Sequence, residues 1–350
     1  MTETSEAIAE GRASLKLDLT RKARVLIVGG YGVRNVGDEA ILAGLLNQLS
    51  EVGAIRVVSR FPAETTMLHG ISAISPKGAL WTLLRSDALI VGGGGLFSSD
   101  TGPFGRYIPL FCRAALLRGI PVAFHGIGIY PSTPPSLLRS VRGLAPRLSS
   151  FTVRDAASSG LMRSLGVQVE QIADLAESMT AADVRVGRDL LRATGILGDK
   201  PIVGLCLTGL REEIAGQLVK TVPKLVESRP DVDFCFIPIS QHPTNLRHND
   251  TIFARQLQEL APRMKILVGL HHPAAVQAVF SQLSLAICVR FHSYVFAHRA
   301  GVPMIGVPYA EKCQGWLDEH SIEGFDLSER SLNSAVSHAL SKTSGQVLAA

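Results

Sequence analysis

The chain has 350 residues, of which 46% are apolar, 6% aromatic and 19% charged. This composition excludes disordered, collagen-like and disulfide-dense proteins, and the length predicts two domains that each bury a core of their own. The 35 Lys and Arg residues outnumber the 30 Asp and Glu residues, which gives a net charge of +5. That excess suits anionic ligands, but it is too small and too dispersed to indicate a nucleic-acid partner.

The amino-terminal residues and the cysteines indicate a cytoplasmic protein. Residues 1–20 contain three glutamates and no apolar core, so we predict a loose tail there and no signal peptide. The five cysteines are far apart in the sequence, as expected for reduced core residues. No apolar run reaches the roughly 18 residues that a membrane span needs. Any membrane contact is therefore expected to be peripheral, at the inner face.

Short β-branched runs alternate with helix-like stretches along the chain, as in parallel βαβ units. Residues 21–178 form a first Rossmann-like domain, residues 201–350 a second, and residues 179–200 a polar linker. The first has predicted strands at 24–28, 55–59, 88–91, 122–124 and 150–153, and a helix at 39–48. The second has predicted strands at 202–206, 234–238, 266–268, 285–289 and 304–307, and helices at 274–280 and 294–299. The fold class is α/β, with two facing, mostly parallel sheets that bind ligands outside the carboxyl ends of their strands.

A glycine-rich turn follows the first strand and contributes the candidate ligand residues Gly32, Asn35, Asp38 and Glu39. Small residues let a backbone approach a ligand, and the following helix offers N–H groups to an anion. A dinucleotide fingerprint is disfavoured because Asn35 stands where that motif needs its third glycine. Asp38 has an alternative role as the N-cap of the helix, with Glu39 complementing the helix dipole.

Two more glycine clusters follow predicted strands and contribute Gly93, Gly94 and Gly126 to the same rim. Each alone is weak evidence, because β–α turns use glycine for steric reasons. His125 precedes Gly126, and a neutral imidazole there could bond a sugar hydroxyl, with a buried structural role as the alternative.

Three cations and a histidine also follow predicted strands. Arg154 closes one strand of the first domain, and its guanidinium suits a carboxylate or phosphate, with pairing to a neighbour as the alternative. In the second domain, Arg290 and His292 close the strand at 285–289, and Lys312 follows the strand at 304–307. If the first of these strands persists, alternation places Arg290 and His292 on one side of it.

The motifs together resemble the polysaccharide pyruvyl transferase family. The resemblance rests on residues 29–41, 92–96, 126–128 and 153–155, and above all on Arg290-Phe291-His292-Ser293 with the blocks at 300–303 and 309–312. It implies a fold like that of the GT-B glycosyltransferases, with the acceptor on the first domain and the donor on the second. It implies phosphoenolpyruvate as donor and a polysaccharide or glycolipid sugar, free or lipid-linked, as acceptor. It also assigns Arg154, His292 and Lys312 to donor binding or catalysis, with Arg290 close by.

The residue types fit that chemistry. Phosphoenolpyruvate carries a carboxylate and a phosphate, which call for several cations, and Arg154, Arg290 and Lys312 supply three. Ketal formation needs a proton on the methylene carbon, and His292 is the best candidate to handle it. The bond that breaks is carbon–oxygen, so no phosphoryl group is transferred through a magnesium-clamped transition state. We therefore expect neither a metal nor a cofactor.

Other interpretations remain. A nucleotide-sugar glycosyltransferase of the same architecture would explain the E-x7-E spacing of Glu311 and Glu319, and a non-catalytic module binding sugars or anions is a third class. Metal ligation by His242 and His248, or by the pair at 271–272, lacks a carboxylate or cysteine at ligand spacing. The arginines at 139, 142 and 147 are interpreted as a solvated helix face, with an anionic lipid surface as the alternative.

Overall fold

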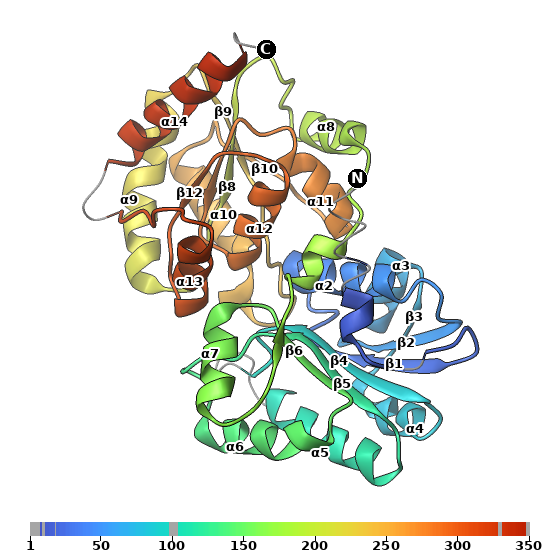
Figure 1. The fold of residues 1–350 in the computed structure, drawn as a ribbon. Coiled ribbons are helices and arrows are strands. Elements are labelled where there is room, and N and C mark those ends of the chain that lie inside the picture. Colours follow the sequence, from blue (N-terminus) through green and yellow to red (C-terminus); the bar gives the residue numbers. More distant parts are fainter. Residues whose placement is uncertain (1–7, 9–10, 18, 98–103, 328–330, 348–350) are drawn as a thin grey trace. The chain divides into compact units, whose positions relative to one another are not determined.

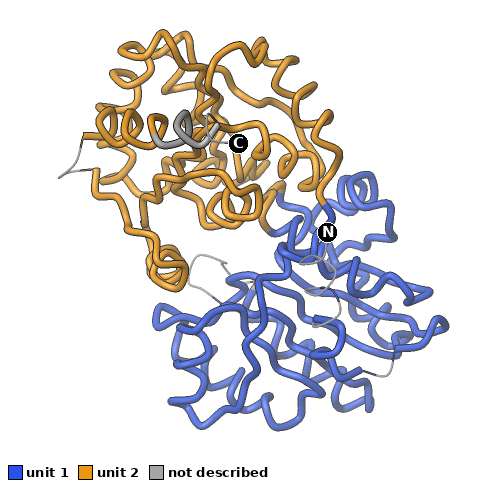
Figure 2. The backbone as a smooth tube through the Cα atoms, turned by 45° about the horizontal axis from the view of Figure 1, so that its top comes forward, with its two compact units in different colours: residues 1–33, 38–180 blue, residues 34–37, 181–350 orange. Residues whose placement is uncertain are grey.

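The computed structural model describes residues 8, 11–17, 19–97, 104–327 and 331–347. The chain divides into two compact units, each described here by itself (Figure 2). Unit 1 comprises Met1–Val33 and Asp38–Thr180, and unit 2 comprises Arg34–Gly37 and Ala181–Ala350. A short piece of the amino-terminal glycine-rich motif therefore belongs to unit 2.

Unit 1 contains a parallel sheet of seven strands in the order β3-β2-β1-β4-β5-β6-β7. The order reverses between β1 and β4, the kind of switch point outside which open α/β sheets bind ligands. The strands are β1 (Arg24–Val28), β2 (Ala54–Val58), β3 (Ser72–Ile74), β4 (Ala88–Gly94), β5 (Val122–Ile127), β6 (Ser150–Val153) and β7 (Glu170–Gln171).

Helices cover both faces of this sheet (Figure 1). Because crossover connections are right-handed, the helices that connect strands toward β3 lie on one face and those that connect strands toward β7 lie on the other. The first set is α2 (Val36–Gln48) and α3 (Pro62–His69). The second set is α4 (Ala79–Leu83), α5 (Phe104–Leu117), α6 (Pro135–Leu144) and α7 (Ala156–Ser164).

Unit 2 contains a second parallel sheet, of five strands in the order β10-β9-β8-β11-β12. Its strands are β8 (Ile202–Cys206), β9 (Asp233–Phe236), β10 (Lys265–Ile266), β11 (Leu285–Cys288) and β12 (Met304–Gly306). Its helices are α8 (Val184–Ala193), α9 (Glu212–Ser228), α10 (Asp250–Leu260), α11 (Pro273–Phe280), α12 (Phe291–Arg299), α13 (Glu311–Glu319) and α14 (Leu332–Val347). The switch point of this sheet lies between β8 and β11.

The central strands are buried along their whole length, as the patterns of β4, β5, β8 and β11 show. Strands covered on both faces are apolar runs in the sequence, so the positions of these strands were predicted well. The predicted fold class, two Rossmann-like domains with parallel sheets, is confirmed. The strands missed by the prediction are β3 and β7, with three and two residues at the sheet edges and no buried position.

The segment predicted as a polar linker contains a helix in the structure. Residues 184–193 form α8, which packs on α11 so closely that a Cβ added to Gly187 would lie 2.0 Å from the carbonyl oxygen of Ala278. The polar residues that suggested a linker form the exposed side of this helix. The polypeptide therefore passes from unit 1 to unit 2 at Thr180–Ala181.

Part of the predicted loose tail is ordered against unit 1. Residues 11–14 are helical, Leu15 is buried, and Ser150 donates a hydrogen bond of 2.7 Å from Oγ to the carbonyl oxygen of Leu15. Leu15 belongs to a short stretch in which leucines alternate with polar residues, a pattern that was not used in predicting a loose tail. Among the described residues, no helix has both the length and the apolar character required to cross a bilayer.

Candidate functional site

The carboxyl edge of the unit 2 sheet carries Arg290 and His292. The strand β11 ends at Cys288 and α12 begins at Phe291, with Arg290 in the N-cap position at φ −68° and ψ 135°. The expectation that strand alternation relates Arg290 to His292 is therefore wrong. A strand-to-helix turn positions both residues, and it places His292 in the first turn of α12.

A buried ion pair holds Arg290. Its Nε donates to both carboxylate oxygens of Asp250 at 3.1 Å, and its Nη2 donates to Oδ1 at 2.6 Å. The Asp250 side chain is 1% exposed, and its Oδ2 also accepts a bond of 2.8 Å from the backbone N–H of Ser240. A buried charge needs such partners, so Asp250 fixes the guanidinium at this edge. Asp250 was not predicted as a site residue, because it lies forty residues from Arg290 in the sequence, at the start of α10.

The glycine-rich motif reaches the same edge through residues 34–37. The backbone N–H of Val36 donates to the carbonyl oxygen of Ile239 at 2.8 Å, and that of Gln241 donates to the carbonyl oxygen of Arg34 at 2.8 Å. Asn35 forms an antiparallel bridge with Ser240. Residues 239–241 follow β9, so this short ladder attaches the start of α2 to the unit 2 sheet.

Asn35 caps α2. Its Oδ1 accepts a bond of 3.1 Å from the N–H of Gly37, the second residue of the helix, which is the usual N-cap geometry. The sequence had suggested Asp38 as this N-cap residue. That interpretation is wrong, because α2 begins two residues earlier, at Val36.

Gly37 lies directly against the imidazole of His292. A Cβ added to this glycine would lie 2.0 Å from Nδ1 of His292, a separation that no side chain tolerates. The His292 ring also contacts the Phe291 ring edge-on, with ring centroids 5.1 Å apart. The glycine-rich motif and the Arg-x-His motif therefore meet within unit 2, and the absence of a side chain at residue 37 permits it.

Lys312 approaches from the next strand of the same sheet. It is the second residue of α13, it is half-buried, and its Nζ lies 5.9 Å from the centroid of the Tyr309 ring. Since β12 pairs in parallel with β11, Lys312 and Arg290 follow neighbouring strand ends. Tyr309 also interacts with the Arg290 side chain.

Unit 1 has a second buried arginine at a strand end. The Arg154 side chain is 2% exposed, its Nη1 donates to Oδ2 of Asp174 at 2.9 Å, and its Nη2 donates to the hydroxyl of Tyr130 at 3.0 Å. That hydroxyl donates to Asp155 at 2.7 Å, and burial raises the pKa of Tyr130. The sequence left open a surface arginine paired with its neighbour. The structure instead buries Arg154 and pairs it chiefly with Asp174, with Asp155 Oδ2 3.7 Å from Nε.

His125 is fully buried within β5 and bonded at both ring nitrogens. Its Nε2 lies 2.8 Å from Oε1 of Gln48, and its Nδ1 lies 3.2 Å from the hydroxyl of Thr152. Because the amide oxygen of Gln48 can only accept, Nε2 carries the ring proton. The Thr152 hydroxyl, which accepts from the N–H of Gly126 at 2.8 Å, therefore donates to Nδ1. Burial lowers the pKa of His125 to about 3. The geometry fits the structural alternative, since protein groups use both nitrogens.

Glu39 fixes the glycine-rich turn rather than merely facing the helix dipole. Its Oε1 accepts from the N–H of Gly32 at 2.8 Å, and its Oε2 lies 2.8 Å from Nε2 of His69. Gly32 has φ +74°, and a Cβ there would lie 1.9 Å from Oγ of Ser59. His69, at the end of α3, was not predicted from the sequence, because a lone histidine thirty residues from Glu39 belongs to no motif.

Asp38 lies beside the second glycine cluster. A Cβ on Gly94 would be 3.2 Å from its Oδ1, and Gly93 and Gly94 have φ of +48° and +76°. The structure thus brings Gly32, Asp38, Glu39 and the β4 glycines together at the switch point of unit 1. Gly126, with φ +63°, instead packs on Leu175, next to the His125 network.

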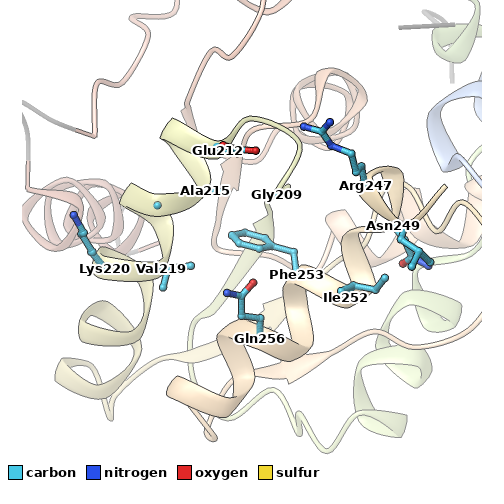
Figure 3. Close-up of a pocket in the computed structure, with 12 residues that line it drawn as sticks. Gly209, Glu212, Ala215, Val219, Lys220, Arg247, Asn249, Ile252, Phe253 and Gln256 are labelled. Atoms are coloured by element: carbon cyan, nitrogen blue, oxygen red, sulfur yellow. The ribbon is translucent and has the colours of Figure 1, made fainter. Parts of the chain in front are cut away.

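Unit 2 also has a surface pocket of about 530 Å³ between α9 and α10 (Figure 3). Phe253 lies between the two helices, and Glu212, Lys220 and Arg247 stand at the margin. Asn249, which precedes the Asp250 partner of Arg290, also lines it.

The residues weighed as metal ligands do not gather into a site. His242 and His248 have ring centroids 6.4 Å apart, and Nδ1 of His242 accepts a bond of 2.9 Å from the N–H of Asn245. Across the described part of the chain, no group of three or more His, Cys, Asp or Glu side chains is arranged to hold a metal ion.

These features define a two-unit α/β protein with polar clusters at the carboxyl edges of parallel sheets. Solved structures of this fold include Anabaena Alr3699/HepE in complex with UDP-glucose, with 14% identity, a TM-score of 0.55, and coverage of 92% of this chain and 94% of that one. They include the S. aureus MnaA-UDP co-structure, with 11% identity, a TM-score of 0.62, and 91% of each chain covered. At these identities, the likeness shows the fold alone.

The sequence itself assigns the family. The family model for polysaccharide pyruvyl transferase matches residues 35–311, and the chain belongs to this family of transferases. The match begins at the Asn35 cap of α2 and ends one residue before Lys312. The search of curated proteins found no match to this sequence.

Proposed function

We propose that the protein transfers the pyruvyl group of phosphoenolpyruvate to two hydroxyl groups of a polysaccharide or glycolipid sugar, forming a pyruvate ketal and releasing phosphate. The family membership supports the transferase class. The observation that carries the finer proposal is the edge of unit 2, where Arg290, His292 and Lys312 follow the neighbouring strands β11 and β12.

The charges suit this donor. Phosphoenolpyruvate is a small polyanion, and an arginine fork and a lysine point charge are the side chains that bind such groups. Asp250 already uses Nε and Nη2 of Arg290, so it holds the guanidinium in one orientation before the donor arrives. Preorganisation of this kind lowers the entropic cost of binding. Arg154 is the further cation that the family resemblance assigns to the donor.

The reaction adds one proton to carbon and removes one proton from each of the two sugar hydroxyl groups. A proton adds to the methylene carbon of phosphoenolpyruvate, the first sugar hydroxyl attacks the cationic C2, and the second hydroxyl then displaces phosphate by cleavage of the C2–O bond. Of the two hydroxyl protons, one balances the new methyl group and the other leaves with phosphate. His292 is the group we assign to proton transfer, because imidazole titrates closest to neutrality.

The acceptor is assigned to the glycine-rich turns of unit 1. Gly32, Gly93 and Gly94 are buried at the switch point, where the partly buried Asp38 adds a carboxylate beside Gly94. Carboxylates and backbone groups are common partners of sugar hydroxyls. In this assignment Glu39 and Asn35 shape the turn and the start of α2, while His125 and Gly126 support the sheet behind it.

A nucleotide-sugar glycosyltransferase is the second candidate, favoured by the fold likeness to proteins solved with UDP or UDP-glucose. The E-x7-E pair, at the two ends of α13, gives it little support, because this spacing arises often by chance in a chain with 30 Asp and Glu residues.

Donor choice is the direct test. Phosphoenolpyruvate should raise the melting temperature of the protein more than UDP-glucose or UDP-N-acetylglucosamine does, since a ligand that binds only the folded state stabilises it. Labelled phosphoenolpyruvate should then pass its label to a member of a glycan panel as phosphate is released. Stabilisation by a nucleotide sugar but not by phosphoenolpyruvate would replace this proposal with the glycosyltransferase.

A further inference from the structure

One helix layer of unit 1 exposes large apolar side chains. Helices α4, α5 and α6 lie on the same face of the sheet and bury their inner sides in one core cluster (Figure 1). Their outer sides expose the large apolar residues Leu80, Trp81, Leu84, Tyr107, Leu110 and Leu117. Trp81 is 64% exposed and Leu117 is 79% exposed. On α5, the residues at 107, 110 and 117 recur at helical spacing and form one stripe.

Arginines surround these apolar residues. Residues 101–154 contain no Asp, Glu or Lys, and the exposed charges in this stretch are Arg106, Arg113, Arg118, Arg139, Arg142 and Arg147. On α4, the guanidinium of Arg85 stacks 3.4 Å from the centre of the Trp81 ring. We call the outer side of α4, α5 and α6, with these apolar and basic residues, the arginine face.

The combination of side chains indicates the occupant. Arginines with interfacial Trp, Tyr and Leu are the composition with which amphipathic surfaces lie on anionic bilayers. Exposed leucines favour acyl chains and gain nothing from the phosphates of a nucleic acid. A second copy of the chain is disfavoured as well, because a two-fold interface would place this positive face against itself.

We infer that the arginine face docks unit 1 on the surface of a membrane that contains anionic lipid. The arginine side chains pair with lipid phosphates, and Trp81, Tyr107 and the leucines enter the headgroup region. Each arginine near such a surface strengthens binding about fivefold at physiological salt. This inference does not depend on the donor or the acceptor of the enzyme.

Vesicle sedimentation tests it with the full chain. The protein should sediment with vesicles of phosphatidylcholine and 30–40% phosphatidylglycerol (roughly the charge density of an anionic leaflet), remain in solution with pure phosphatidylcholine, and dissociate as salt is raised. The triple variant Arg106→Gln, Arg113→Gln, Arg142→Gln should bind roughly 100-fold more weakly. A matched variant, Arg211→Gln, Lys224→Gln, Arg255→Gln, removes three exposed charges from unit 2 and should bind like the wild type.

Tryptophan fluorescence locates the contact. The chain has two tryptophans, Trp81 on the arginine face and Trp316, which is 5% exposed in unit 2. Anionic vesicles should shift the emission to the blue in the wild type and leave it unchanged in Trp81→Phe, whose remaining signal comes from Trp316. Equal sedimentation of the two triple variants, an unchanged Trp81 emission, or binding to heparin but not to vesicles would each overturn the inference. So would a concentration-dependent dimer that Leu110→Ser abolishes while vesicles are not bound.

Discussion

Units 1 and 2 share one arrangement at the carboxyl end of a buried parallel strand, in which an aspartate and a tyrosine hold a buried arginine. In unit 1 it is Arg154 with Asp174 and Tyr130. In unit 2 it is Arg290 with Asp250, and Tyr309 contributes as well. Each aspartate belongs to a segment that the strand order brings beside the arginine, so both clamps are products of the tertiary fold.

The two units differ in the position of the histidine that lies near each arginine. His125 lies inside β5 with both ring nitrogens bonded, and its pKa is lowered to about 3. His292 lies beyond the end of β11, in the first turn of α12, at the edge where open α/β sheets present residues to ligands. His125 is bonded within its sheet, whereas the proton transfer of the proposed reaction is assigned to His292, past the end of its strand.

The largest effect should come from His292→Asn. The substitution retains part of the side-chain shape but cannot transfer a proton, so kcat should fall by about 10² to 10⁴ while phosphoenolpyruvate still raises the melting temperature. His125→Asn is the matched control in unit 1, expected to lower the free energy of unfolding by about 1–3 kcal/mol with kcat little changed. A near-normal kcat for His292→Asn would assign the proton transfer to another group.

Arg154→Ala should reduce the free energy of unfolding by about 3–5 kcal/mol, because it leaves Asp174 charged and buried without its partner. Denaturant titration measures this loss. The double variant Arg154→Met, Asp174→Leu removes both charges and should recover most of the stability. Arg154→Lys keeps a charge, so a loss of phosphoenolpyruvate affinity in that variant reports on the planar guanidinium itself. A loss below 1 kcal/mol for Arg154→Ala would contradict the buried pair.

Gly37→Ala should displace the His292 ring, because the new methyl group would overlap Nδ1. Overpacking of this kind costs about 1–3 kcal/mol, and kcat should fall with the misplaced imidazole. Gly315→Ala on α13 is the control, since a Cβ there meets nothing within 4 Å and should stabilise the helix slightly. Equal kcat values for the two variants would contradict a role for the Gly37 contact in positioning His292.

His125 should make unit 1 sensitive to acid. Its pKa is about 3 in the folded protein and about 6.5 when unfolded, so between these values the unfolded state binds the proton and the folded state does not. The contribution to stability is complete above pH 6.5 and is lost as the pH falls, by about 1.4 kcal/mol per unit. Denaturant midpoints at pH 6 and pH 5 should therefore differ more for the wild type than for His125→Asn. An equal pH dependence of the two midpoints would contradict a lowered pKa for His125 in the folded protein.

The smallest effect should be that of EDTA. The proposed reaction cleaves a carbon–oxygen bond and assigns no step to a metal ion, so turnover should stay within about twofold of the untreated protein. A strict requirement for Mg²⁺ or Mn²⁺ would contradict the assignment of the charges to Arg290, Lys312 and Arg154.

The sequence alone determined the two parallel sheets, because strands buried on both faces are mostly apolar runs, and β1, β6 and β8 were predicted with their observed bounds. It also predicted Arg154, Arg290, His292 and Lys312 as candidate site residues, since residues that follow such strands lie at the carboxyl edge of their own sheet. Only the tertiary structure decided what they touch. Asp174, Asp250 and His69 carry no local pattern, and the contact of Gly37 with His292 joins residues 255 positions apart. Periodicity reports burial along a segment, whereas ion pairs and ring contacts depend on which segments the strand order brings together.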